Sequence, residues 1–85
     1  MTTATAIKKL EKNGFKVTQN PNNGQFHSAK KEGSKTLVEF TRNGREDEVS
    51  CIGIRDENDH SDSMTDYCAT IFCRSLKQAI TLAAR

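Results

Sequence analysis

The apolar residues at the start of the chain follow a helical spacing. Ile7 and Leu10 lie three positions apart in TTATAIKKLEK, which places both on one face of a helix. Thr3 or Thr5 can cap the first turn with its hydroxyl oxygen. Asn13–Gly14 follows, and glycine readily adopts the left-handed conformation that ends many helices. The pattern therefore predicts an N-terminal helix that stops just before residue 14.

The end of the chain shows the same helical spacing. Ser75 is a favourable N-cap residue, and the segment LKQAITLAA follows it directly. The apolar residues that share one face of this segment are Leu76, Ala79, Ile80 and Ala83. We predict a second helix here, packed through this face onto the rest of the domain.

Apolar and polar residues alternate in the region between the helices. FKVT, QFHSAKK, KTLVEFTR and EVSCIGIR have the two-residue period of half-buried strands, and turn residues separate them. EVSCIGIR is the most apolar of them and is predicted to be the central strand. DYCATIFC alternates as a further extended segment. We predict an α+β fold: an N-terminal helix, an antiparallel sheet of three to four strands, and a C-terminal helix packed on one face.

The hairpin around Asn43 admits two registers. A two-residue loop would set Phe40 opposite Asp47 and bring a charge to the core face. A four-residue loop over residues 43–46 avoids this, so we prefer it. It gives the cross-strand pairs Phe40–Val49 and Val38–Cys51.

Length and composition allow one small core. The chain has 85 residues, of which 34% are apolar and 28% charged. A chain of this length buries about 60–65% of the surface that its unfolded form exposes, so a large catalytic cleft is not expected. We predict a single α+β domain over residues 1–85.

The cysteines and the hydropathy pattern indicate a cytoplasmic protein. Cys51, Cys68 and Cys73 cannot all pair within one chain, which favours reduced thiols. The N-terminal segment lacks the apolar run of a secretion signal, and no segment has the roughly 20 apolar residues of a membrane span.

Charge is distributed unevenly along the chain. Residues 1–45 carry nine Lys and Arg against three Glu, a formal charge of +6, whereas residues 46–85 carry four basic and eight acidic groups, a charge of −4. The net charge of +2 thus hides a basic half and an acidic half. The two halves suit partners of opposite charge.

The basic half predicts one candidate surface, a site for nucleic acid. The lysines that would form it are Lys8, Lys9, Lys12, Lys30 and Lys31. Helix, strands and helix is also the element order of double-stranded-RNA-binding domains. Those domains carry a lysine cluster at the start of their second helix, where this chain has only Arg74 and Lys77. The alternative is that the lysines only solvate a helix and a sheet edge.

The acidic half predicts a second candidate surface, for a basic protein partner. The residues that would form it are Asp56, Glu57, Asp59, His60, Asp62, Asp66 and Tyr67. Clustered carboxylates give fast, salt-sensitive association with a basic groove. The alternative is local, because Asp and Ser side chains also fix turns by bonding to nearby backbone amides.

Metal binding and catalysis fit the same segment less well. Counted as a calcium loop from Asp56, the segment has Ser61 where glycine belongs and Tyr67 where glutamate belongs. A zinc site could recruit His60, Cys68 and Cys73, which falls short of four ligands at the usual spacing. His60 as a base with a cysteine nucleophile lacks further support. We therefore predict no metal, no cofactor and no enzymatic activity.

The segment DENDHSDSMTDYCATIFCRSLKQAI resembles small domains of phage and mobile-element proteins, of the large polyvalent-protein-associated type. The matching positions are Asp59, Asp62, Asp66, Tyr67, Ala69, Phe72, Leu76, Lys77, Gln78 and Ala79. Cys68 and Thr70 depart from that pattern. Such domains have no established activity and are associated with the protection of invading DNA.

The resemblance implies a viral or mobile-element protein that works by binding in the bacterial cytoplasm. On this interpretation the protein inhibits a host defence system of the restriction or CRISPR type. It would occlude a basic surface of the host complex with residues 56–66, and Tyr67 would anchor it. The alternative is a nucleic-acid-binding module that uses the lysines. Either form could be a monomer or a homodimer.

Overall fold

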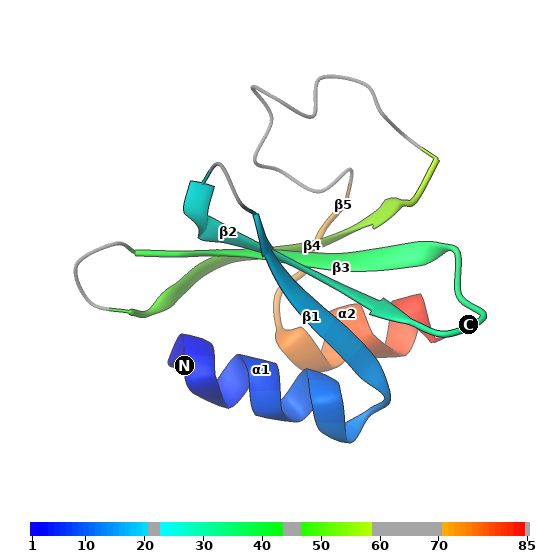
Figure 1. The fold of residues 1–85 in the computed structure, drawn as a ribbon, viewed down its shortest axis with the longest axis horizontal. Coiled ribbons are helices and arrows are strands. Elements are labelled where there is room, and N and C mark those ends of the chain that lie inside the picture. Colours follow the sequence, from blue (N-terminus) through cyan, green and yellow to red (C-terminus); the bar gives the residue numbers. More distant parts are fainter. Residues whose placement is uncertain (21–22, 44–46, 59–70, 85) are drawn as a thin grey trace.

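The computed structural model describes residues 1–20, 23–43, 47–58 and 71–84 and contains two helices and five strands (Figure 1). In chain order the elements are α1 (Thr3–Lys12), β1 (Phe15–Asn20), β2 (Asn23–Lys31), β3 (Thr36–Arg42), β4 (Val49–Asp56), β5 (Ile71–Phe72) and α2 (Leu76–Ala83). The predicted α+β class is confirmed. The sheet has five strands rather than three to four, because residues 71–72 of the extended segment pair with β4.

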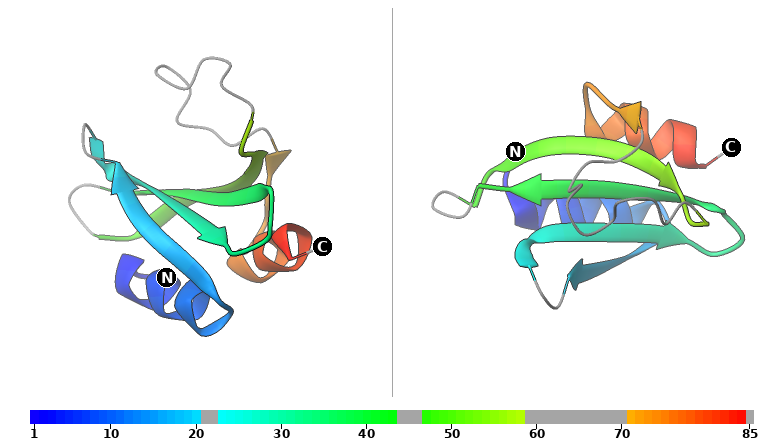
Figure 2. Two further views of the ribbon diagram at one scale, coloured as in Figure 1. Left: turned by 45° about the vertical axis from the view of Figure 1, so that its right-hand side comes forward. Right: turned by 90° about the horizontal axis from the view of Figure 1, so that it is seen from above.

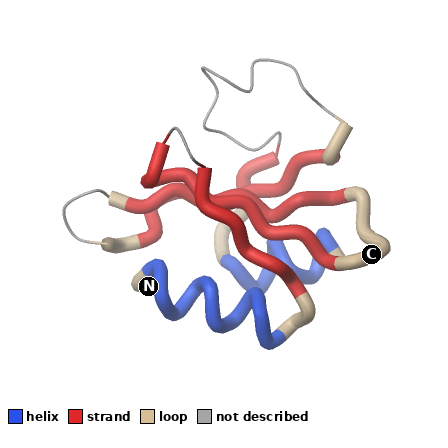
Figure 3. The backbone as a smooth tube through the Cα atoms, viewed as in Figure 1, coloured by secondary structure: helices blue, strands red, loops and turns tan. Residues whose placement is uncertain are grey.

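The strands form one antiparallel sheet in the order β1-β2-β3-β4-β5. Each strand therefore pairs with its neighbour in the sequence, and β3, not β4 as predicted, occupies the middle. Both helices lie on the same face of this sheet (Figures 1 and 2). Figure 3 shows the resulting two layers, with the opposite, outer face of the sheet turned away from the helices.

Side-chain caps fix where the helices begin. Thr2, rather than the predicted Thr3 or Thr5, caps α1: its hydroxyl oxygen accepts a hydrogen bond from the backbone N–H of Thr5 at 3.2 Å. Thr3 faces the core and is buried instead. Ser75 caps α2 as predicted and accepts from the N–H of Gln78 at 3.1 Å. Gly14, with a φ of 88°, turns the chain from α1 into β1 as predicted.

The core lies between the helices and the sheet. Its buried residues are Ala6 and Leu10 from α1, Phe15, Ala29, Val38 and Phe40 from the strands, and Leu76, Ala79 and Ala83 from α2. The predicted apolar faces of both helices are thus the faces that pack on the sheet. Small alanines on both helices allow their backbones to approach the strands closely.

The β3–β4 register differs from both of those considered from the sequence. Phe40 lies opposite Ile52, and Val38 lies opposite Ile54. The register also shifts between Thr41 and Arg42, where Ser50 is the extra residue of β4. This arrangement turns both isoleucines towards the helices and leaves Cys51 exposed. Burying two isoleucines stabilises the sheet more than burying one valine and one cysteine, which explains why the preferred register was wrong.

The outer face of the sheet contains a buried ion pair. Glu39 is only 1% exposed, although the alternation of β3 places it on the face away from the helices. Arg55 in the neighbouring strand β4 donates a hydrogen bond from its Nη2 to Oε2 of Glu39 at 2.5 Å. Gly53 lies directly opposite Glu39 in β4 and places no side chain beside it. A charge-assisted bond in this setting holds the register of β3 against β4.

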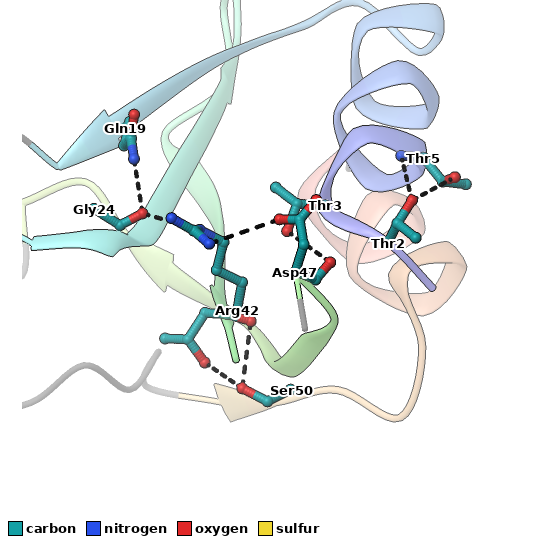
Figure 4. A network of polar contacts seen from close by, with 9 residues as sticks. Thr2, Thr3, Thr5, Gln19, Gly24, Arg42, Asp47 and Ser50 are labelled. Carbon is teal, nitrogen blue, oxygen red and sulfur yellow. Dashed lines mark hydrogen bonds and ion pairs between the residues drawn. The ribbon is translucent and has the colours of Figure 1, made fainter. Parts of the chain in front are cut away.

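Arg42 stabilises the end of the molecule at which α1 begins (Figure 4). Its Nε donates to the carbonyl of Gly24 at 3.2 Å, a carbonyl that also accepts from the Gln19 side chain at 2.7 Å. Its guanidinium lies 3.8 Å from the Asp47 carboxylate. The carbonyl of Asp47 in turn accepts from the backbone N–H of Thr3 at 3.0 Å. This arginine of the basic half is therefore engaged within the fold.

His27 makes the stability of the fold depend on pH. The ring is 5% exposed and stacks on Phe40, with 4.9 Å between the ring centres, and its Nδ1 has no hydrogen-bond partner among the described residues. Burial, and secondarily the charge of Arg42, lower the pKa of His27, while Asp47 raises it slightly. The folded protein therefore resists protonation more than the unfolded chain does, and protonation favours unfolding.

We expect the contribution of His27 to the free energy of unfolding to be constant above the ordinary histidine pKa of 6.5 and to fall as the pH drops below it. Urea denaturation of the wild type and of His27→Phe at several pH values measures this. His27→Phe keeps a ring on Phe40 but cannot titrate, so its stability should fall less between about pH 7 and pH 5.5. Parallel curves for the two proteins would contradict this role of His27.

Candidate anion-binding groove

An open groove of about 450 Å³ lies between the two helices, on the side of the sheet that they cover. Its lining residues are Lys9, Lys12 and Asn13 from the end of α1, and Lys77, Ile80 and Thr81 from α2. Three of these six side chains carry a positive charge, and none carries a negative charge. The groove is therefore suited to an anion.

The helical repeat places these side chains together. Lys9 and Lys12 are three residues apart, so they are neighbours on the surface of α1. Lys77 and Thr81 are four residues apart on α2, and Ile80 lies between them at the base of that surface, half-buried against the core. Packing α1 on β1, and α2 on β3 and β4, then fixes the two lysine-bearing surfaces side by side.

The hydrogen bonds of the groove leave its ammonium groups available. The Asn13 amide donates to the carbonyl of Lys9 at 2.8 Å, and the Thr81 hydroxyl donates to the carbonyl of Lys77 at 2.9 Å. These neutral side chains are thus engaged with their own helices. Within residues 1–20, 23–43, 47–58 and 71–84, no carboxylate lies within 4.0 Å of the ammonium group of Lys9, Lys12 or Lys77.

Lys9 and Lys12 also have a structural role. Both lie in the last turn of α1, where the partial negative charge of the helix end attracts cations. Each such interaction contributes about 0.3–1 kcal/mol to stability. Lys77 lies in the first turn of α2, where the helix dipole is unfavourable to a cation, and the dipole therefore does not account for its position.

Only two of the five lysines predicted to bind nucleic acid line the groove. Lys8 is exposed on α1 but does not line it. Lys30 lies on the outer face of the sheet, paired with Glu57 at 2.5 Å. Lys31 covers the turn after α1, with its Cε 3.5 Å from the point where a Cβ on Gly14 would lie. Lys9 and Lys12 of the predicted set thus line the groove together with Lys77, which that set did not include.

The predicted acidic surface is described only at its start. Oδ1 of Asp56 accepts from the backbone N–H of Asn58 at 2.8 Å, and Glu57 pairs with Lys30. Both described carboxylates therefore have partners within the fold. The remaining residues of that prediction, Asp59, His60, Asp62, Asp66 and Tyr67, lie outside the described residues.

The residues considered for metal and thiol chemistry belong partly to the acidic segment, of which only the start is described. Among the described residues, no three His, Cys, Asp or Glu side chains come close enough together to hold a metal ion. Two of the candidate zinc ligands, His60 and Cys68, lie outside the described residues. Burial raises the pKa of the Cys73 thiol, so this sulfur stays protonated near neutral pH and is a poor nucleophile.

Of the described helices, which span ten and eight residues, neither could cross a membrane.

Searches against known proteins give no relative: no protein-family model, no curated protein and no solved structure matches this chain. The groove and its three lysines are therefore the observations from which a function can be argued.

Proposed function

We propose that this chain is a non-enzymatic binding module whose groove holds the phosphate backbone of a nucleic acid. The observation that carries the proposal is that three lysines, Lys9, Lys12 and Lys77, line one groove and have no carboxylate partner in the described structure. A lysine ammonium is a compact charge with three donors that binds phosphate without fixing a particular geometry.

An extended anion fits the groove better than a single small one. The three lysines are exposed and the groove is open, so water competes for each ammonium group. A single surface ion pair of this kind contributes about 0–1 kcal/mol. A polymer with regularly spaced phosphates can engage all three lysines at once and gains further from the release of its counterions.

The test replaces all three lysines. We expect Lys9→Gln, Lys12→Gln and Lys77→Gln together to weaken binding to a mixed-sequence duplex by about tenfold or more at about 50 mM salt. The slope of log affinity against log salt concentration should also become shallower by about one per lysine removed. Fluorescence anisotropy of a labelled duplex measures both quantities.

A matched variant separates the groove from net charge. Lys8→Gln, Lys16→Gln and Lys35→Gln change the net charge by the same amount at three exposed lysines that do not line the groove. This variant should retain most of the affinity. Equal losses in the two variants would show that overall charge, and not the groove, attracts the nucleic acid. Urea denaturation of both variants checks that they are folded.

Inhibition of a host defence system, the function that the acidic segment and the phage-domain resemblance predict, stays a prediction. Asp56 and Glu57 have local partners, and the other residues of that surface are not among those described. Asp59→Ser, Asp62→Ser and Asp66→Ser together would test it, because that function requires them and nucleic-acid binding by the groove does not.

A further inference from the structure

We infer that the groove binds double-stranded nucleic acid in preference to single strands and does not read the base sequence. This inference rests on the proposed function and specifies its ligand. Two observations support it, the position of the aromatic side chains and the hydrogen bonds of the neutral groove residues, and a physical argument about charge density follows from the three lysines.

The described aromatic residues are not placed to stack on bases at the groove. Proteins that bind single strands hold successive bases on exposed aromatic side chains, which contribute about 1–3 kcal/mol per base. Here Phe15, Phe26 and Phe40 are buried. Phe72 is 60% exposed, but it lies opposite Gly53 on the outer face of the sheet, away from both helices. A single strand in the groove would therefore leave its bases without a stacking partner from the described residues.

The neutral side chains of the groove are also poorly placed to read base edges. Sequence is read in the major groove by bidentate contacts, above all from Arg to guanine and from Asn or Gln to adenine. The amide of Asn13 is held by the Lys9 carbonyl, and the hydroxyl of Thr81 donates to the Lys77 carbonyl. Among the described residues, no arginine lines the groove. Phosphate contacts position a protein on nucleic acid without selecting a sequence.

An ionic contact of this kind favours the duplex. Double-stranded DNA carries one charge per about 1.7 Å of its axis, twice the density of one of its strands. The affinity falls with salt with a slope of about −0.9 per neutralised phosphate for a duplex and about −0.7 for a single strand. For the three lysines that line the groove, the slopes are about −2.7 and about −2.1. At about 50 mM salt this difference alone corresponds to about sixfold tighter binding of the duplex.

The experiment measures anisotropy of the wild-type protein with four labelled probes of equal length. They are two duplexes of unrelated sequence, one strand of the first duplex, and poly-glutamate. We expect both duplexes to bind with equal affinity and about sixfold tighter than the single strand at about 50 mM salt. Between about 50 and 200 mM salt, duplex affinity should fall about 40-fold and single-strand affinity about 20-fold.

The outcomes separate this inference from the function on which it rests. Equal or tighter binding of the single strand would overturn the inference and leave the proposed function standing. A strong preference for one duplex sequence would overturn the claim that bases are not read. Poly-glutamate binding as tightly as the duplex would show that the groove takes an acidic polypeptide instead. Failure of every nucleic acid to bind would overturn the proposed function itself.

Discussion

Arg55→Met is expected to lower the free energy of unfolding by about 3–5 kcal/mol. The change removes the guanidinium that lies 2.5 Å from the Glu39 carboxylate but keeps most of the apolar volume of the side chain. Glu39 is 1% exposed and would retain a buried charge without this partner. Domains have a total stability of about 5–15 kcal/mol and a chain this short is expected near the lower end, so this loss removes most of its stability. Urea denaturation followed by circular dichroism measures it.

The double variant Arg55→Met and Glu39→Met is the control for this prediction. It removes both charges at once and replaces them with apolar side chains, which is often neutral for a buried ion pair. We expect it to recover most of the stability that Arg55→Met loses. If Arg55→Met alone costs less than about 1 kcal/mol, as for an exposed ion pair, then the Glu39 carboxylate is not buried in the way that the structure indicates.

Phe40→Ala is expected to cost about 3–5 kcal/mol, the second large effect. Phe40 is 1% exposed in the middle strand, lies opposite Ile52 in β4, and carries the stacked ring of His27. Truncation removes its buried apolar surface and leaves a cavity beneath both helices. It also opens His27 to water, so the fall in stability below pH 6.5 should become smaller in this variant.

Phe72→Ala provides the matched control, since the same atoms are removed from a ring that is 60% exposed. A change of no more than about 0.5 kcal/mol is expected there, as for most surface substitutions. Comparable losses at Phe40 and Phe72 would contradict the assignment of the core to the helix-covered face of the sheet. Both variants can be measured by urea denaturation at the same pH.

The sequence was sufficient to predict the helices because their signals are local. The spacing of Ile7 and Leu10, the cap at Ser75 and the stop at Gly14 each depend on residues within a few positions. The first cap was predicted at Thr3 or Thr5 and lies at Thr2, because three threonines near the start offer the same hydroxyl. Tertiary burial of Thr3 resolves the choice, and burial is not visible in the sequence.

The β3–β4 register and the burial of Glu39 could not be predicted, because both depend on contacts between residues of different strands. Pairing Phe40 with Ile52 needs an extra residue at Ser50, and a shift of this kind has no specific residue pattern. Alternation alone would place Glu39 in solvent on the outer face. Arg55 and Glu39 are sixteen residues apart, and only the observed register sets them on adjacent positions of the same face.

Two of the three lysines that line the groove belong to the set predicted from the sequence. Lys9 and Lys12 belong to a visible cluster on one helix. Lys77 is not in the predicted set, because the second helix lacks the lysine cluster that double-stranded-RNA-binding domains carry there. In the fold, α2 packs on the same face of the sheet as α1 (Figure 1), and this brings Lys77 to the groove. Lys30, which belongs to the predicted set, lies on the other face of the sheet because of strand alternation, next to Glu57.

The central claim is that nucleic acid binds between the helices. It is tested most directly by titrating a short mixed-sequence duplex into isotope-labelled protein and following the backbone amide signals by NMR. The account predicts that the largest shifts cluster at the residues that line the groove, which are Lys9, Lys12, Asn13, Lys77, Ile80 and Thr81. Shifts concentrated instead on the outer face of the sheet, around Lys16, Lys30 and Arg55, would contradict it.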